Sequence, residues 1–130
     1  MGYTAKIYYH HTDCGGVVYY GTYLNFLEEA RTEFLASRGI SVDEFMQKGY
    51  YFVVSRQEMD YKLPARYGDT IVINTEIEAV KGVRIVLCHN ITNKAGQLLV
   101  AAKTTLAFID KQFKPVALPD IIRNKLLTQG

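Results

Sequence analysis

The chain has 130 residues, of which 48% are hydrophobic and 22% are charged, and its formal net charge is +2. This balance indicates one ordinary globular domain over residues 1–130 and excludes a disordered, collagenous or multi-domain protein. The basic residues form no block or stripe, so nucleic-acid binding is not expected. A chain of this size buries roughly two-thirds of its unfolded surface, which leaves little room for a deep pocket, and a second subunit is expected to complete any substrate site.

Neither a membrane segment nor a disulfide framework is expected. The longest wholly apolar run, Leu98 to Ala102, is far shorter than the roughly 20 residues that span a bilayer. The N-terminus has no signal-like apolar stretch, so the sequence predicts a cytoplasmic protein without membrane insertion. Cys14 and Cys88 match no metal-binding or redox spacing, and we expect both as reduced thiols.

The first half of the chain predicts one strand and two helices. Residues 3–11 are rich in aromatic and β-branched types and predict a strand. From Thr22 onward apolar residues recur every three or four positions, which predicts a helix of about four turns with Thr22 as its N-cap and Gly39 just beyond its end. The spacing of Ser41 and Glu44 is that of a capping box and predicts a short second helix.

The second half predicts an antiparallel sheet, because the apolar period falls to two. Residues 51–63 predict a half-buried strand, and three more strands joined as consecutive hairpins follow at 70–80, 83–92 and 97–109. Residues 120–127 predict a last short helix on the surface. The predicted fold class is therefore α+β, with helices grouped on one face of an antiparallel sheet.

The densest cluster of reactive side chains lies at residues 10–16, and three kinds of site compete there. A metal site would use His10, His11 and Asp13, but neighbouring side chains of a strand point to opposite faces and cannot easily reach one ion. A Cys14 nucleophile would need a local signature, which is absent, and a lone cysteine is more often a small hydrophobe. We expect no metal and no cofactor.

The third kind of site uses Asp13. This residue lies in a loop that precedes a helix N-terminus, where the unpaired N–H groups of about Tyr20 to Tyr23 favour negative charge. Acyl transfer needs a group that attacks or activates water and donors for the resulting oxyanion, and Asp13 with this helix end would supply both. Gly15 and Gly16 let the main chain come close to a ligand. The alternative is that Asp13 only caps a turn, since Asp beside Gly is common in loops.

Residues 12–20, together with 29–33, 60–61, 64–69 and 114–116, resemble the hotdog-fold thioesterases of the 4-hydroxybenzoyl-CoA thioesterase family, especially its YbgC-like acyl-CoA thioesterases. The resemblance covers nearly the whole chain. It implies a curved antiparallel sheet of about five strands wrapped around a long central helix. It also implies a homodimer or homotetramer with active sites at the subunit interface.

The resemblance implies an acyl-CoA thioesterase in which Asp13 is the nucleophile or general base. The backbone N–H of Tyr20 would polarise the thioester carbonyl, and the role of the Tyr20 side chain stays open because members often carry His there. Arg or Lys side chains would bind the CoA phosphates. The implied substrate-binding residues are Gly16, Val17, Tyr23, Val54 and Ser55, and those for the CoA phosphates are Arg66, Lys81 and Arg84.

Because the leaving group is a thiolate, a single carboxylate is chemically sufficient for hydrolysis of a thioester. A thiolate derives from an acid with a pKa of about 8.5, so its departure needs less protonation than that of an amine, and no histidine base is required. Two other functions stay open from the sequence. One is hydrolysis of acyl groups carried by acyl carrier protein, and the other is a non-catalytic hotdog module that binds acyl thioesters or a protein partner.

Overall fold

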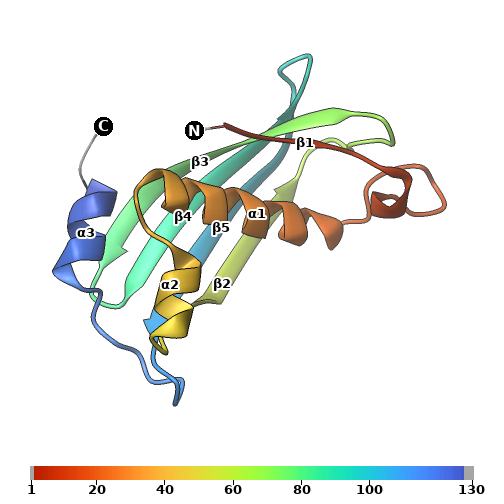
Figure 1. Ribbon diagram of the computed structural model, residues 1–130. Coiled ribbons are helices and arrows are strands. Elements are labelled where there is room, and N and C mark those ends of the chain that lie inside the picture. Colours follow the sequence, from red (N-terminus) through yellow and green to blue (C-terminus); the bar gives the residue numbers. More distant parts are fainter. Residues whose placement is uncertain (1, 128–130) are drawn as a thin grey trace.

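A computed structural model describes residues 2–127 of the chain (Figure 1). Its elements are β1 (Gly2–Lys6), a short 3-10 helix (Tyr9–His11), α1 (Thr22–Ser37), α2 (Val42–Gln47), β2 (Tyr51–Tyr61), β3 (Thr70–Lys81), β4 (Arg84–Asn93), β5 (Leu98–Ile109) and α3 (Asp120–Leu127). The strands form one five-stranded antiparallel sheet in the order β1-β3-β4-β5-β2. The α+β class and the hairpins of β3, β4 and β5 are confirmed.

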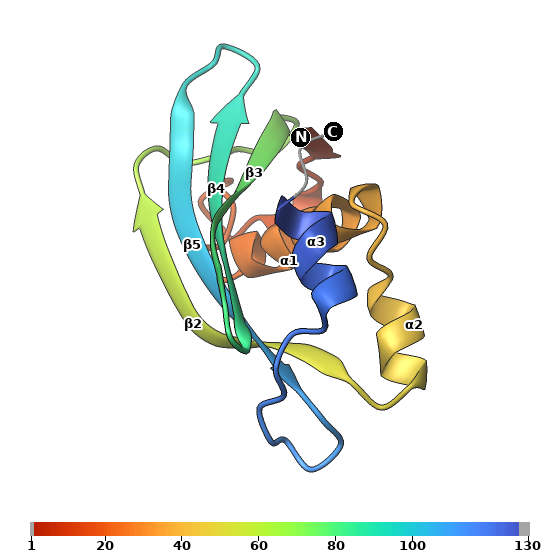
Figure 2. The same ribbon diagram turned by 90° about the vertical axis from the view of Figure 1, so that its left-hand side faces the viewer.

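The sheet is curved, and α1 lies against its concave face (Figure 2). The helix is amphipathic, and the residues that it buries recur every three or four positions: Tyr23, Phe26, Leu27, Ala30, Phe34 and Leu35. The strands meet this stripe with alternate residues, as the pleat requires. A curved sheet wrapped around a long central helix, which the resemblance implied, is what the chain forms.

The buried apolar residues form two clusters, one at each end of α1. The first includes Leu27 and Ala30 with the ends of the strands nearest residue 70, and the second includes Phe34 and Leu35 with the opposite strand ends, α2 and α3. Between them lies a polar layer, which we define as Arg31, Gln57, Thr75, His89 and Thr104. The Thr104 hydroxyl donates to Oε1 of Gln57 over 2.8 Å, and the Thr75 hydroxyl and Nδ1 of His89 share a hydrogen bond of 2.9 Å.

His89 is only half satisfied in this layer. Its side chain is 1% exposed, and Nε2 is buried without a hydrogen-bond partner in the described residues. Burial, and secondarily the positive charge of Arg31, lower the pKa of His89 to about 4. The structure therefore shows a neutral imidazole with one ring nitrogen that has no hydrogen-bond partner in the described residues.

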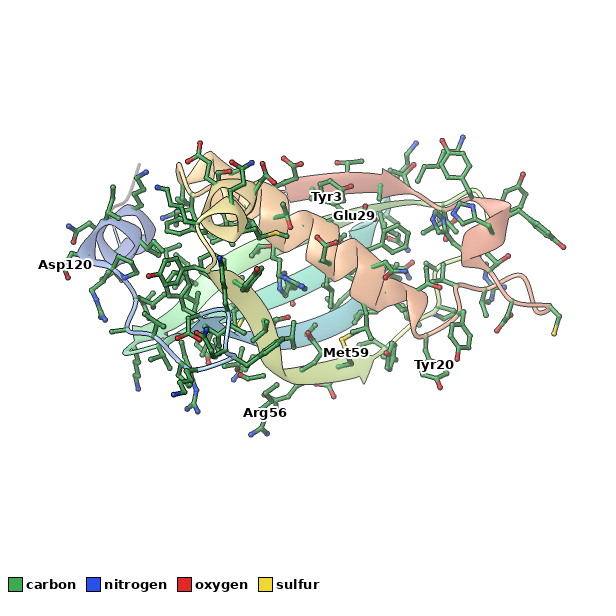
Figure 3. The ribbon with its side chains drawn as sticks, turned by 60° about the horizontal axis from the view of Figure 1, so that its bottom comes forward. Tyr3, Tyr20, Glu29, Arg56, Met59 and Asp120 are labelled. Carbon is green, nitrogen blue, oxygen red and sulfur yellow. The ribbon has the colours of Figure 1, made fainter. Side chains whose placement is uncertain are left out.

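The first strand is shorter than predicted. It ends at Lys6, and residues 9–11 form a 3-10 helix because the backbone N–H of Tyr8 donates to Nδ1 of His11 over 2.8 Å. The edge strand is also fastened to α1, since the Tyr3 hydroxyl donates to the Glu29 carboxylate over 2.6 Å (Figure 3). This hydrogen bond raises the pKa of Tyr3 to about 12.

The helix ends are close to the prediction. The N-cap of α1 is Gly21 rather than Thr22, and Gly39 adopts the left-handed φ of 76° expected just beyond the helix. The N-cap of α2 is confirmed, because the Ser41 hydroxyl accepts from the N–H of Glu44. The last helix is less exposed than predicted, since Ile122 and Leu126 lie one turn apart and both pack into the second cluster. No helix within residues 2–127 is long and apolar enough to cross a bilayer.

The low pKa of His89 predicts a pH-dependent stability. The folded protein holds the imidazole neutral down to about pH 4, whereas the unfolded chain binds a proton below about 6.5. The free energy of unfolding should therefore fall by about 3 kcal/mol as the pH falls from 6.5 to 4. In urea unfolding, the His89→Leu variant should not show this fall in the free energy of unfolding between pH 6.5 and 4. The exposed His10→Leu is the matched control, and an unchanged slope in His89→Leu would contradict the assignment.

Candidate functional site

Residues 12–18 form a small hairpin in front of α1. Thr12 and Val18 pair as an antiparallel bridge, and the N–H of Asp13 donates to the carbonyl of Val17 over 3.0 Å. The turn at its tip is closed by the N–H of Gly16, which donates to the carbonyl of Asp13 over 3.1 Å. Asp13 is therefore displayed at the tip of a short, hydrogen-bonded hairpin.

The Asp13 carboxylate is exposed and held by one backbone donor. The N–H of Gly15 donates to Oδ1 over 2.9 Å, which is the turn-capping contact that the sequence left open as an alternative. In the part of the chain that the structure describes, Oδ2 accepts no hydrogen bond, and none joins this carboxylate to the start of α1. Glycines are needed around it: a Cβ on Gly15 would lie 3.3 Å from Oδ1, and Gly16 has a φ of 76°.

A turn from a distant part of the sequence fixes the hairpin. Val17 pairs with Arg66 as a bridge, the N–H of Val18 donates to the carbonyl of Ala65, and the N–H of Tyr67 donates to the carbonyl of Gly16. The turn itself is capped, because Asp69 accepts from the N–H of Arg66 over 2.8 Å. Gly16, Val17 and Arg66 therefore lie together.

Tyr23 ties this turn to the helix. Its buried hydroxyl accepts from the N–H of Ala65 over 3.1 Å, and burial raises the pKa of Tyr23. The predicted site residue Tyr23 thus positions the turn from within the core. Its ring, not its hydroxyl, is what the site can offer to a ligand.

The start of α1 supplies free N–H groups. Residues 19–22 form a turn closed by the N–H of Thr22 and the carbonyl of Tyr19, and within the described chain the N–H groups of Tyr20 and Gly21 donate no hydrogen bond. The Tyr20 carbonyl accepts from the Tyr61 hydroxyl over 3.2 Å. Figure 3 shows Tyr20 at this end of α1, while Asp120 lies on α3 at the opposite end of the molecule. This turn has the donors that an oxyanion requires.

A groove of about 280 Å³, which we name the tyrosine groove, opens beside this turn. Its walls come from the end of the 12–18 hairpin, the start of α1 and the end of β2: Val18, Tyr20, Tyr23, Tyr61, Lys62, Leu63 and Pro64. The sequence singled out Tyr20 and Tyr23 but missed Tyr61 and Leu63. Tyr61 carries a signal, since it belongs to the segment 60–61 that resembles the family, whereas Leu63 lies beyond β2 and outside the resembling segments. A larger groove, of about 620 Å³ between α1, α3 and β3, contains no predicted site residue.

Four predicted site residues lie elsewhere. Val54 and Ser55 stand at a bulge of β2, and the Ser55 hydroxyl donates to the carbonyl of Thr105. Lys81 and Arg84 face each other at the β3–β4 turn, the end of β3 opposite Thr70 and the Asp13 hairpin. β3 alone spans roughly 35 Å between those ends. One chain does not bring these residues to Asp13.

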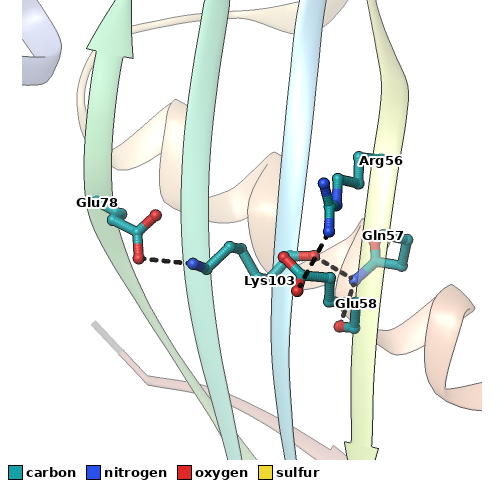
Figure 4. A network of polar contacts seen from close by, with 5 residues as sticks. All are labelled: Arg56, Gln57, Glu58, Glu78 and Lys103. Atoms are coloured by element: carbon teal, nitrogen blue, oxygen red, sulfur yellow. Dashed lines mark hydrogen bonds and ion pairs between the residues drawn. The ribbon is translucent and has the colours of Figure 1, made fainter.

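The convex face of the sheet carries a separate network of charges (Figure 4). Lys103 reaches across β4 to pair with Glu78 over 3.0 Å, and Arg56 pairs with Glu58 over 3.7 Å. Burial and a hydrogen bond to Glu78 raise the pKa of the Cys88 thiol, so this cysteine is held in its protonated form away from the hairpin. Across residues 2–127, no group of three His, Cys, Asp or Glu side chains could hold a metal ion.

Comparisons with known proteins point to one family. The model of the thioesterase superfamily matches residues 15–100. The acyl-CoA thioester hydrolase YbgC of Escherichia coli O6:H1 is 38% identical over 118 residues, covering 90% of this chain and 88% of that protein. The acyl-CoA thioesterase YbgC of Haemophilus influenzae is 32% identical over 95% of this chain and 91% of its own.

Solved structures share the fold. The crystal structure of a DHNA-CoA thioesterase from Staphylococcus aureus superposes with a TM-score of 0.87 at 28% identity, covering 90% of this chain and 79% of that one. The family model begins at residue 15, within the 12–18 hairpin, and spans α1, α2, β2, the 64–69 turn, β3 and β4.

Replacing Tyr23 by Phe should weaken the contact between the 64–69 turn and α1. The change removes only the hydroxyl and leaves the buried N–H of Ala65 without a partner, which should lower the free energy of unfolding by about 1–3 kcal/mol. Urea titration followed by circular dichroism measures the loss. Tyr67→Phe removes an exposed hydroxyl of the same turn and should change the stability little. Equal stabilities of the two variants would show that the Tyr23 hydroxyl does not hold the turn.

Proposed function

The chain belongs to the thioesterase superfamily and is a thioester hydrolase of the hotdog fold, and we propose that it cleaves acyl-CoA thioesters with Asp13 as its catalytic carboxylate. Family membership gives the reaction, and the exposed carboxylate at the tip of the 12–18 hairpin carries the proposal for the residue. The relatives named as acyl-CoA hydrolases favour CoA over a carrier protein as the group that bears the acyl chain.

The proposed mechanism uses one carboxylate and the helix end. The thioester carbonyl oxygen accepts from the free N–H of Tyr20, and the positive end of the α1 dipole stabilises the oxyanion that forms. Asp13 attacks the carbonyl carbon or takes a proton from the water that attacks it. The carbon–sulfur bond then breaks, CoA leaves as a thiolate and takes up a proton, and one water molecule is consumed to give the free acid.

The surroundings of Asp13 support either role. The N–H of Gly15 orients Oδ1, and Oδ2 stays available in the described chain to meet a carbonyl carbon or a water molecule. Gly15 and Gly16 present no side chain that would block the approach of a thioester. The 64–69 turn holds the hairpin still, which favours a preorganised site.

We further propose that two chains build each site. β2 is an edge strand of the sheet, and its apolar side chains Val54 and Tyr61 are exposed. Two copies paired antiparallel along β2 would set the Tyr61 end of one strand against the Tyr51 end of the other. The Val54 and Ser55 region of the second chain would then approach the Asp13 end of the first.

The same pairing would explain where the basic residues lie. Arg84 and Val53 both pair with Ala107, so the Lys81–Arg84 turn belongs to the end of the sheet that carries Val54. The second chain would therefore bring Lys81 and Arg84 toward the site, and Arg66 would come from the first. These cations would bind the phosphates of CoA.

Asp13→Asn tests the carboxylate. The amide can neither attack nor accept the proton, so the hydrolysis of acyl-CoA thioesters should fall by on the order of a hundredfold or more. Release of the CoA thiol over a panel of short, long and aromatic acyl groups measures the loss. Asp43→Asn on α2, outside the site, is the matched control. Near-normal turnover by a folded Asp13→Asn protein would exclude Asp13 as the catalytic group.

A complementation experiment tests the shared site. Asp13→Asn removes the carboxylate and Val54→Trp fills the wall from the other end of the chain, so each homodimer should be strongly impaired. A mixed dimer isolated with two different tags holds one intact site of two and should regain about half of the wild-type activity. No gain in an isolated mixed dimer would show that Asp13 and Val54 serve different sites. A fully active monomer would exclude the shared site altogether.

A further inference from the structure

The tyrosine groove presents ring surfaces rather than hydroxyl groups. The Tyr61 ring lies 6.3 Å from that of Tyr20 at an interplanar angle of 83°, and 5.8 Å from that of Tyr23 at 50°. The Tyr61 hydroxyl donates to the Tyr20 carbonyl, and the Tyr23 hydroxyl accepts from Ala65. Each of these two hydroxyls therefore makes a hydrogen bond within the fold, and the ring of each residue lines the groove.

Tyr20 completes the aromatic wall. Its ring lies 4.6 Å from that of Tyr19 at an interplanar angle of 39°, and interaction with the Tyr20 hydroxyl raises the pKa of Tyr19. Tilted and perpendicular arrangements of this kind are those that a further aromatic ring can join, because ring edges are positive and ring faces negative. The other lining residues are apolar except Lys62, which is exposed.

The size of the groove limits its occupant. Its volume of about 280 Å³ lies at the lower end of the range for small-molecule sites, about 300–1,000 Å³. A long acyl chain would extend beyond it, whereas one ring with a short spacer would fit. The groove also adjoins the Tyr20 peptide, whose N–H is the proposed oxyanion donor, so a group bonded to the thioester carbonyl would reach it. None of the proposed phosphate-binding residues Arg66, Lys81 and Arg84 lines the groove, so we assign that group to the acyl part of the substrate.

We propose that the tyrosine groove is the acyl pocket and that it selects acyl groups ending in one aromatic ring without polar substituents. The inference rests on the proposed function and names its substrate class. A ring inserted among Tyr20, Tyr23 and Tyr61 gains edge-to-face contacts that a saturated ring of the same size lacks. A hydroxyl on the ring would lose part of its hydration in the groove, where the Tyr23 and Tyr61 hydroxyls already make one hydrogen bond each within the fold.

Three CoA esters separate the effect of an aromatic ring from the effect of a hydroxyl on that ring. Phenylacetyl-CoA and cyclohexylacetyl-CoA share their carbon skeleton and an isolated thioester, and differ in the aromaticity of the ring. The wild-type protein should show a kcat/KM about three- to tenfold higher for phenylacetyl-CoA. Its kcat/KM for 4-hydroxyphenylacetyl-CoA should be lower than for phenylacetyl-CoA by about tenfold or more. Equal or inverted values for either pair would overturn the inference.

Two variants test whether the preference for an aromatic ring arises in the tyrosine groove. Tyr61→Leu keeps an apolar wall and removes a ring, so the ratio between phenylacetyl-CoA and cyclohexylacetyl-CoA should fall to about one. Tyr67→Leu removes an exposed ring at the same end of the molecule but outside the groove, and should keep the wild-type ratio. A ratio that persists in Tyr61→Leu would show that another surface binds the ring.

Filling the groove is an independent check if Tyr61→Leu does not fold. Leu63→Trp should lower kcat/KM for phenylacetyl-CoA at least tenfold and that for acetyl-CoA much less, since acetyl does not reach the groove. Equal losses for both esters would contradict the assignment of the pocket. Turnover of acetyl-CoA or hexanoyl-CoA without any aromatic preference would overturn this inference and leave the proposed function standing. Failure to cleave any CoA ester would overturn both.

Discussion

The burial of one face of α1 in the concave side of the sheet is the contact on which the rest of the molecule depends. It carries most of the helix's apolar side chains into two clusters and fixes where the helix begins. Because Tyr23 is part of that buried face, its hydroxyl reaches Ala65 and brings the 64–69 turn to the helix start. The same turn then fastens the 12–18 hairpin. A hydrophobic contact in the core therefore determines where an exposed carboxylate stands.

The two kinds of chemistry at this end have different physical origins. The carboxylate is placed by local geometry, since a turn of Asp13, Gly15 and Gly16 forms from neighbouring residues. The Tyr20 and Gly21 N–H groups lie immediately before the first turn of α1, where no preceding turn supplies an acceptor. In the proposed mechanism neither feature works through a metal or a histidine base, which suits a leaving group that departs as a thiolate. The cost is an open site, which a single small domain cannot enclose.

Sequence reasoning succeeded where the determining contacts are local. The N-cap at Ser41 and the alternation of β3 to β5 are set by neighbours in the chain, and the structure has them as predicted. Sequence reasoning failed at residues 8–11. There Nδ1 of His11 accepts a hydrogen bond from the Tyr8 N–H, and residues 9–11 form a 3-10 helix instead of the predicted strand. The turn at Asp13 could be predicted from the sequence, but the tyrosine groove could not, because Tyr61 meets Tyr20 only through the tertiary fold.

The polar layer beneath α1 has a consequence for how this protein can change over evolutionary time. Apolar residues on its two sides do not share a cluster, so changes in packing at the Asp13 end need not be compensated at the α3 end. The hydrogen-bonded Thr75–His89 and Gln57–Thr104 pairs act as a boundary that also penalises any sliding of the helix along the sheet. The half of the core beneath the site is therefore free to diversify while the other half keeps the domain folded.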